Sequence, residues 1–287
     1  MKYKTTLLFA SSCLLINTIS AKMDTVSIGK AFDDKRVKLV ILSKGGHTGQ
    51  CISMNIKSQS ADSMLLFIEA GRKLDSKDST QQDILIVKDV FVPLASNQQK
   101  TVDVTGFCCQ AHNGSPRADS IFFVGSLKDK KLYELGRYLN KAKLDNGSIQ
   151  YAVWAISDDN EVSSIGDDGT KEVADLRQFV TKLKNLPIEF GWYSIYYKKV
   201  KGKLFSGEPE KVTGHFDYYI SDFSHVYLNI RDAQGTVVKA FEVSKAAERG
   251  SYTYNLNWDA SKNRTGIYSV RLYENGKELK KLAINLK

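Results

Sequence analysis

The sequence predicts a mainly β protein: an N-terminal β-sandwich with two or three helices, followed by a C-terminal Ig-like β-sandwich. Short segments rich in β-branched and aromatic residues alternate with turn residues along most of the chain. Apolar residues recur at helical spacing in the middle of the chain. The chain contains 14 Tyr and 13 Phe but 4 Pro, a composition that favours paired strands over disorder.

Residues 1–21 have the organisation of a signal peptide. Lys2 and Lys4 form a charged start, Thr5–Ile19 is apolar, and the small residues Ser20 and Ala21 suit a cleavage site. The apolar run is too short for a membrane span. We therefore expect an exported protein without a transmembrane segment after cleavage, which is periplasmic, associated with the outer membrane or secreted.

Residues 22–186 are expected to form the first domain. Its predicted strands cover residues 36–44, 50–58, 64–71, 83–94 and 100–109. The turn Gly45–Gly49 joins the first two of them. Val102 and Val104 alternate with polar residues, which is the period of a half-buried strand.

Three helices are predicted after this run of strands. Leu132, Leu135, Leu139 and Ala142 share one helical face, a second helix begins with Ser148 as N-cap, and a third covers Val173–Leu183 before Pro187. The polar segment Asp158–Thr170 between the last two is predicted to be a loop.

Residues 187–287 are expected to form the second domain. Seven short alternating segments occupy residues 191–200, 215–223, 225–232, 237–244, 251–258, 267–274 and 279–286. The sequences Asp232–Gly235 and Glu274–Gly276 are typical of hairpin turns. Seven strands in about a hundred residues indicate an Ig-like sandwich.

Two resemblances accompany these patterns. The D-x-x-G turn, the W-D pair and the G-I-Y strand within residues 213–287 resemble the Ig-like domain of the flagellar hook-capping protein. They also resemble C-terminal β-domains of secreted Bacteroidota proteins, some of which are type IX secretion signals, and this implies surface display. Residues 26–166 resemble a group of uncharacterised secreted bacterial proteins, a resemblance that implies no activity.

The charge balance is basic, with a formal net charge of +9. The Lys and Arg residues are scattered among predicted strands, which favours a solvated sheet face with protected edges. No basic stripe with interleaved aromatic residues points to nucleic acid. An anionic surface stays open as a ligand, so the expected partner is an unknown surface glycan or protein.

Three cysteines follow the leader: Cys51, Cys108 and Cys109. In an exported protein they predict one disulfide, between Cys51 and either Cys108 or Cys109, with one thiol left over. Neighbouring strand residues point to opposite faces, so only one of the vicinal pair can face Cys51. A strained disulfide within the vicinal pair is a further alternative.

The same cysteines allow a metal site. His47 and Cys51 on one segment, with Cys109 and His112 on another, would offer nitrogen and sulfur ligands to zinc or copper if the two strands were neighbours. Neither half has C-x-x-C spacing, and turn histidines are usually exposed. No cofactor is therefore expected.

A third interpretation concerns Phe107-Cys108 and Ile149–Trp154. The two segments resemble the paired motifs of thioester adhesin domains, in which an aromatic-Cys pair and a T-Q-x-A-I/V-W segment form an internal Cys–Gln thioester. The resemblance implies a bond between Cys108, or Cys109, and Gln150, which an amine of the target opens to give a covalent tether. Ile149 stands where the motif has Thr. The alternative is that Ala152, Val153 and Trp154 are simply helix core.

No hydrolase, metalloprotease, nucleotide-binding or dinucleotide-binding motif is present in the sequence. The predicted function is non-enzymatic binding or structural work by an exported protein. A thioester adhesin and an enzyme with an unrecognised site are the alternatives.

Overall fold

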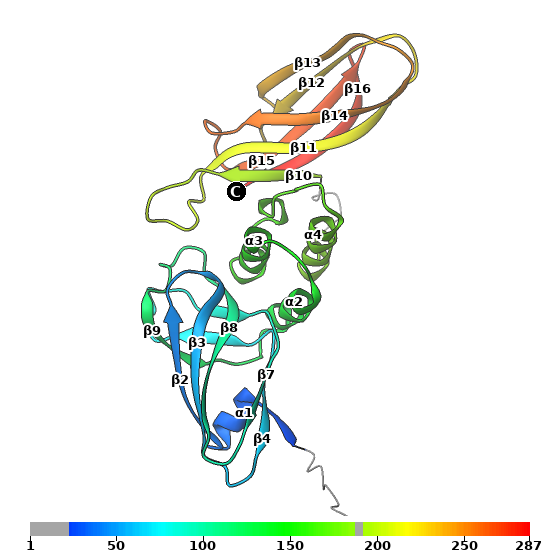
Figure 1. Cartoon of the computed structure of the whole chain (residues 1–287). Helices are drawn as coiled ribbons and strands as arrows, with labels where there is room; N and C mark the ends of the chain where they lie inside the picture. Colours follow the sequence, from blue (N-terminus) through cyan, green and yellow to red (C-terminus); the bar gives the residue numbers. More distant parts are fainter. Residues whose placement is uncertain (1–22, 187–191) are drawn as a thin grey trace, which may run out of the picture.

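The computed structural model describes residues 23–186 and 192–287. The predicted leader and the predicted domain boundary at residue 187 lie outside the described residues. The mainly β class is confirmed (Figure 1). Within the described residues, no helix is both long and apolar enough to cross a membrane.

Most N-terminal strands form a closed barrel in the order β2-β3-β8-β6-β5-β9. The barrel strands are β2 Val37–Lys44, β3 Thr48–Ser58, β5 Lys73–Ser76, β6 Ile84–Ile86, β8 Gln99–Cys108 and β9 Ala118–Val124. Pairing of β2 with β9, for example Ile41 with Phe122, closes the ring. The expected N-terminal sandwich is therefore a rolled sheet. A register shift between Gly49 and Ile52 of β3 is a bulge, which raises the local twist and favours closure.

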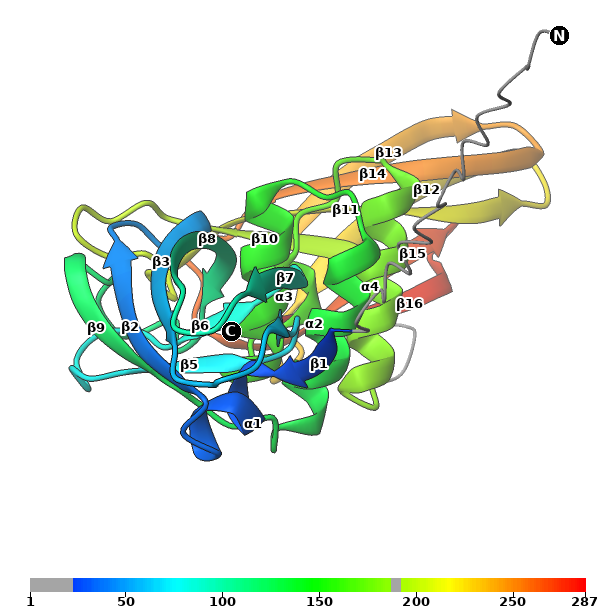
Figure 2. The same cartoon turned by 60° about the horizontal axis from the view of Figure 1, so that its bottom comes forward.

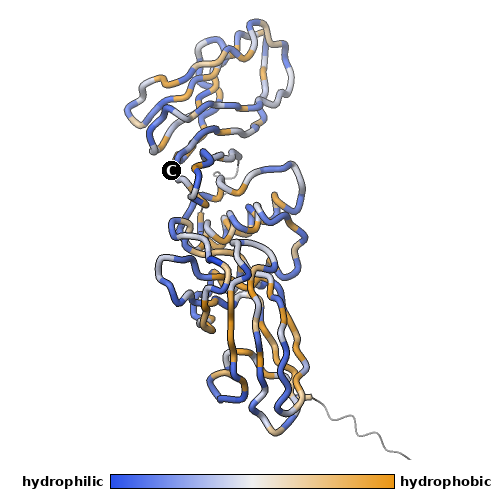
Figure 3. Tube along the Cα trace, turned by 60° about the vertical axis from the view of Figure 1, so that its left-hand side comes forward, coloured by the Kyte–Doolittle hydropathy of each residue, from blue (hydrophilic) through white to orange (hydrophobic). Residues whose placement is uncertain are grey.

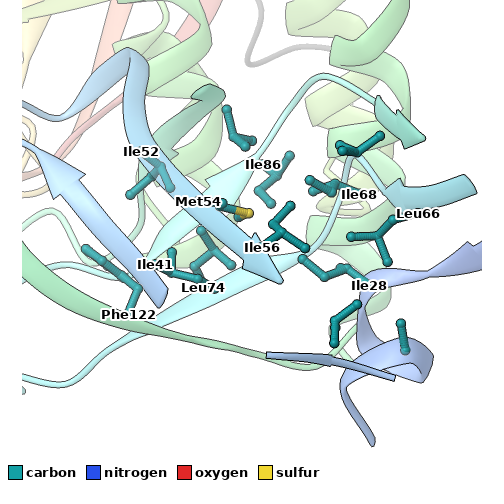
Figure 4. Close-up of a cluster of buried hydrophobic side chains, with 14 of the residues drawn as sticks. Ile28, Ile41, Ile52, Met54, Ile56, Leu66, Ile68, Leu74, Ile86 and Phe122 are labelled. Carbon is teal, nitrogen blue, oxygen red and sulfur yellow. The ribbon is translucent and has the colours of Figure 1, made fainter. Parts of the chain in front are cut away.

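A small sheet, β1-β4-β7, accompanies the barrel. It consists of β1 Asp24–Ser27, β4 Met64–Ile68 and β7 Val90–Leu94, with the short helix α1 Ile28–Asp33 after β1. Its apolar side chains, Leu66 and Ile68 among them, meet Ile56 and Ile86 of the barrel in one buried cluster (Figure 4). Figure 2 looks toward this part of the molecule, with β1 and α1 beside the barrel strands.

The three longer helices form a layer between the barrel and the C-terminal strands (Figure 1). They are α2 Lys130–Lys141, α3 Asn146–Ser157 and α4 Lys171–Leu183, and the short helix η1 Val162–Ser164 interrupts the predicted loop. The prediction that Ser148 is the N-cap of α3 is wrong. The N-cap is Asp145, because its carboxylate accepts a hydrogen bond from the Ser148 N–H.

The described C-terminal residues contain seven strands, as predicted. They are β10 Tyr193–Tyr197, β11 Pro209–Ile220, β12 Ser224–Arg231, β13 Val237–Ala247, β14 Gly250–Asp259, β15 Gly266–Glu274 and β16 Lys277–Leu286. Two antiparallel sheets, β10-β11-β14 and β13-β12-β15-β16, enclose a core that contains Trp258 and Tyr193. Apolar and polar residues alternate along these strands, as Figure 3 shows.

The sandwich contacts the helical layer through polar groups. Arg177 of α4 donates to the Ser194 hydroxyl at 2.9 Å. Glu161, before η1, accepts from Asn285 Nδ2 at 3.0 Å and pairs with Lys287 at 2.9 Å. Both ends of the C-terminal strand set therefore contact the helices.

Candidate functional site

Strand β8 ends at Cys108, and the chain then turns sharply. The Cys109 N–H donates to the Asp83 carbonyl at 2.8 Å. Gln110 has a left-handed backbone, with φ 61°, and its side chain bonds Asp83 twice. Gln110 Oε1 accepts from the Asp83 N–H at 2.8 Å, and Nε2 donates to the Asp83 carboxylate at 2.7 Å. This reciprocal pair fixes the direction in which the chain leaves Cys109.

The two vicinal cysteines face different cores. Cys108 belongs to the apolar cluster inside the barrel, which also contains Cys51. Cys109 belongs to the cluster formed with Ile149 and Val153 of α3. The predicted alternation of faces is therefore present, and all three thiols are buried.

Burial makes the three thiols weakly acidic. It raises the pKa of Cys51 to about 11. The pKa of Cys108 is raised well above its usual value by burial first, and then by the nearby Cys51, Cys109 and Asp83. Burial also raises the pKa of Cys109, with Asp83 adding to the effect. The thiols are neutral near pH 7, so they are poor nucleophiles without a base.

Gln150 makes direct contact with Cys108. Its Oε1 accepts a hydrogen bond from the Cys108 N–H at 3.1 Å, and its Nε2 donates to the Cys108 carbonyl at 2.7 Å. The main chain of Cys108 therefore both donates a hydrogen bond to the carboxamide and accepts one from it, at the point where β8 ends. Gln150 is 3% exposed, so these bonds are shielded from water.

The turn of α3 that follows Gln150 is held in place by contacts of the Trp154 side chain. The Trp154 indole N–H donates to the buried Gln82 side chain at 3.3 Å. The Trp154 ring lies 5.9 Å from Phe205, which comes from the segment between β10 and β11. The same small apolar cluster also contains Ala111, Tyr151, Tyr197 and Leu204. A segment of the C-terminal domain therefore covers the turn of α3 beside the Cys108–Gln150 contact.

The predicted disulfide is not formed. All three cysteines of the described residues are free thiols. Cys51 lies in the bulge of β3 opposite Thr105, so Cys108 is three residues further along β8. Three residues of strand span about 10 Å, whereas a disulfide joins Cα atoms up to about 7 Å apart. Cys109, on the other face, is no better placed to bond Cys51.

The four residues considered for zinc or copper do not meet. Cys51 lies inside the barrel and Cys109 faces the helices. The His112 ring packs edge-on against Phe205, with 5.9 Å between the ring centres. In residues 23–186 and 192–287, no three His, Cys, Asp or Glu side chains converge as metal ligands. Alternation along β8 is the physical reason, because it separates the sulfur atoms.

A separate groove of about 850 Å³ lies on the C-terminal sandwich, lined by Trp192, Phe216 and Arg271 among others. Tyr219 and Phe223 are exposed elsewhere on the same sandwich, at 49% and 66%. Neither feature touches Cys108 or Gln150.

Comparison with known proteins adds little. No family model and no curated protein matches the chain. Among solved structures the chain is similar to the CBM51-2 and INT domains of ZmpB from Clostridium perfringens. The identity is 12%, the coverage is 86% of this chain and 77% of that chain, and the TM-score is 0.18. A TM-score this low assigns neither fold nor function.

The resemblance to thioester domains paired Gln150 with Cys108 or Cys109, but the sequence did not point to the residues around this contact. Asp83 and Gln110 hold the turn after Cys109, and Phe205 packs on Trp154 from a distant segment. Gln110 directly follows the two cysteines, and a polar side chain at that position was the available signal. Phe205 gave no local signal, because its contact depends on how the C-terminal domain is placed.

Proposed function

We propose that the protein is an exported surface-binding protein that attaches to its partner through a thioester between Cys108 and Gln150. The observation that supports this proposal is the double hydrogen bond of the Gln150 carboxamide to Cys108. Two segments that are separated by 42 positions meet at the two residues that the bond requires.

The chemistry balances without a further reagent. The Cys108 sulfur attacks Cδ of Gln150, an S–C bond forms, the C–N bond breaks, and ammonia leaves with the thiol proton. The Cys108 N–H already contacts Gln150 Oε1 at 3.1 Å, so it is placed to stabilise negative charge on that oxygen in the tetrahedral intermediate. A primary amine of the target then forms a C–N bond while the C–S bond breaks, and the thiol is regenerated.

Burial supports a lasting attachment. Gln150 is 3% exposed and Cys108 is fully buried, so water has little access to the thioester. After the amine has reacted, the raised pKa of Cys108 keeps its thiol neutral near pH 7. A neutral thiol attacks an amide poorly, so the tether does not revert.

The intact mass of the protein, purified after export, tests the proposal. We expect it to be one ammonia lighter than the sequence of the processed chain, and incubation with methylamine should add one methylamine to that lighter form. Gln150→Ala and Cys108→Ser should show neither change, whereas Cys109→Ser should show both.

A mass without the loss of ammonia in the wild-type protein would refute the thioester. It would leave non-covalent binding, for which the exposed Tyr219 and Phe223 of the C-terminal sandwich are available. A loss of ammonia that disappears in Cys109→Ser but persists in Cys108→Ser would assign the bond to the other sulfur.

A further inference from the structure

The outer face of the sheet β13-β12-β15-β16 carries positive charges on neighbouring strands. The residues on either side of Arg271 belong to the sandwich core, so the Arg271 side chain points outward from β15. Lys281 of β16 is directly opposite Arg271 and is exposed. Arg231 of β12 is opposite Ser269, which is one diagonal step from Arg271 on the same face. Three consecutive strands therefore each present a cation on this face.

Arg271 and Lys281 are held close together by the register of the two strands. The Trp192 indole N–H donates to the Ala283 carbonyl at 3.1 Å, so the main chain of Ala283 faces away from β15. The main chain of Lys281, two residues earlier on β16, faces the same way. The pair with Arg271 is therefore of the non-hydrogen-bonded type, in which Cα atoms are about 4.5 Å apart. Like charges directly opposite each other destabilise a sheet, and an anion bound between them removes this cost.

The carboxylates on this face do not balance the cations. Arg271 pairs with Glu278 at 3.1 Å. Arg231 is bonded to neutral oxygens, one of which is the Gly235 carbonyl at 2.9 Å. Within residues 23–186 and 192–287, Lys281 has no ion-pair partner. One carboxylate thus serves three cations.

The cations adjoin the groove of about 850 Å³ on the C-terminal sandwich, which Arg271 and Lys281 help to line. Ser269 and Ala283, opposite each other on β15 and β16, also line it. Their small side chains leave space between the cations and Trp192, another lining residue. The groove therefore offers positive charge beside an aromatic ring, with room for a ligand between them.

Two carboxylates line the same groove, and both already have partners. Asp232 accepts hydrogen bonds from the Gln234 N–H at 3.0 Å and the Thr236 N–H at 2.8 Å. Asp217 accepts from the Thr253 hydroxyl at 2.6 Å. Because these bonds occupy the two carboxylates, Lys281 and Arg231 stay available to a ligand.

We propose that this groove binds an acidic polysaccharide. Its carboxylates pair with Arg271 and Lys281, and the Trp192 ring gives apolar contact to a sugar ring, a combination typical of ligand sites. A single-stranded nucleic acid would need free aromatic faces for its bases, but Tyr227 and Tyr273 on this sheet stack on each other at 4.9 Å. The site is separate from Cys108 and Gln150, so it does not depend on the thioester.

Titration of the processed full-length protein with polygalacturonate, followed by calorimetry, tests the site. Its methyl ester has the same backbone without the charge and should bind roughly 10-fold more weakly, as expected for the loss of a charged hydrogen bond. The double variant Arg271→Gln, Lys281→Gln should weaken binding of the acid at least as much. The matched control Lys211→Gln, Lys262→Gln removes two exposed charges elsewhere on the sandwich and should bind as wild type.

A variant that keeps every charge tests the groove itself. Ala283 is exposed, and Ala283→Trp should fill the groove and also weaken binding. Absence of binding in wild type, equal binding by the two double variants, or wild-type binding by Ala283→Trp would overturn the proposal. Tighter binding of single-stranded DNA or of phosphatidylserine vesicles would overturn the assignment to a polysaccharide. Polygalacturonate has no amine, so none of these results depends on the thioester.

Discussion

Gly106 lies on β8 two residues before Cys108, where neighbouring side chains leave no space. A Cβ atom there would lie 2.3 Å from Ile84 Cγ2 and 3.3 Å from the Leu85 carbonyl oxygen. The Gly106 carbonyl also accepts a hydrogen bond from the Cys51 thiol, at 3.4 Å. The absence of a side chain thus permits β6 to approach β8 this closely.

We predict that Gly106→Ala destabilises the protein by about 1–3 kcal/mol, because the added methyl group must displace Ile84. Urea unfolding followed by circular dichroism measures this change. Gly250→Ala is the control, since its Cβ would meet Tyr252 at an ordinary 3.7 Å, and its effect should stay within about 0.5 kcal/mol. Equal stability of the two variants would contradict the steric argument.

At the scale of elements, the first two turns of helix α3 carry the Gln150 side chain that contacts Cys108. Its N-cap Asp145 accepts from the Ser148 N–H at 3.0 Å, and Gln150 follows within the first two turns. Burial alone would raise the pKa of Asp145, but hydrogen bonds from Ser148 and neighbouring main-chain groups lower it below 3.8. A depressed carboxyl pKa contributes stability above pH 3.8, which is lost as pH falls through the lower folded value.

We predict that Asp145→Ala costs about 1 kcal/mol, the usual value for a lost N-cap, and increases hydrolysis of the thioester by loosening the first turn of α3. Asp129→Ala is the control because it removes the equivalent cap of α2, which accepts from Leu132 at 3.0 Å. It should lower stability similarly without changing hydrolysis. Intact mass over time reports hydrolysis, and identical hydrolysis in both variants would refute the link.

Elements differ in how well the sequence predicts them. The seven C-terminal strands were predicted because alternation is local and each strand has a polar face. Residues 83–94 were expected to form one strand, yet β6 and β7 belong to different sheets. Asp89 separates them, since its carboxylate holds Arg137 at 2.7 Å and Asn140 at 2.7 Å on α2. Such a contact between distant segments leaves no periodic signal.

At the scale of the whole molecule, Glu161 connects the helical layer to the C-terminal sandwich. It is buried, accepts from Asn285 and pairs with Lys287. Tyr193 of β10 accepts from the Asn285 N–H at 2.8 Å beside it. Because Phe205 also covers Trp154, the sandwich and the proposed site are in physical contact.

We predict that Glu161→Ala uncouples the two parts of the protein. Removal of the carboxylate leaves the Asn285 amide without its acceptor, which costs about 1–3 kcal/mol in a buried setting. Differential scanning calorimetry should show two transitions, or a broader one, where the wild type has one. Glu208→Ala, which breaks the exposed contact with Lys198 at 3.6 Å, should leave the profile unchanged. A single unchanged transition in Glu161→Ala would refute the coupling.

The way in which distant strands pair was harder to predict from the sequence than the mainly β fold class. Closure of the barrel depends on β2 pairing with β9, about eighty residues away in the chain, and no local pattern encodes such a pairing. The polar strand β5 and the segment that contains β1 and α1 were also missed, because they are short and lack alternation. For the site, Cys108 and Gln150 were predicted together only through a motif. Their contact depends on how α3 packs on the end of β8.

The double hydrogen bond between Gln150 and Cys108 has a consequence for the direction of the proposed chemistry. A thioester has a carbonyl oxygen but no N–H, so the reactive form cannot donate to the Cys108 carbonyl as Nε2 does in the unreacted chain. A buried carbonyl without a donor costs about 1–3 kcal/mol. The secondary amide formed with a target amine has both a carbonyl and an N–H again. Reaction with the partner therefore restores the hydrogen bond that thioester formation removes. The tethered form would thus have the Cys108 carbonyl hydrogen-bonded again, and would be more stable in this respect than the thioester form.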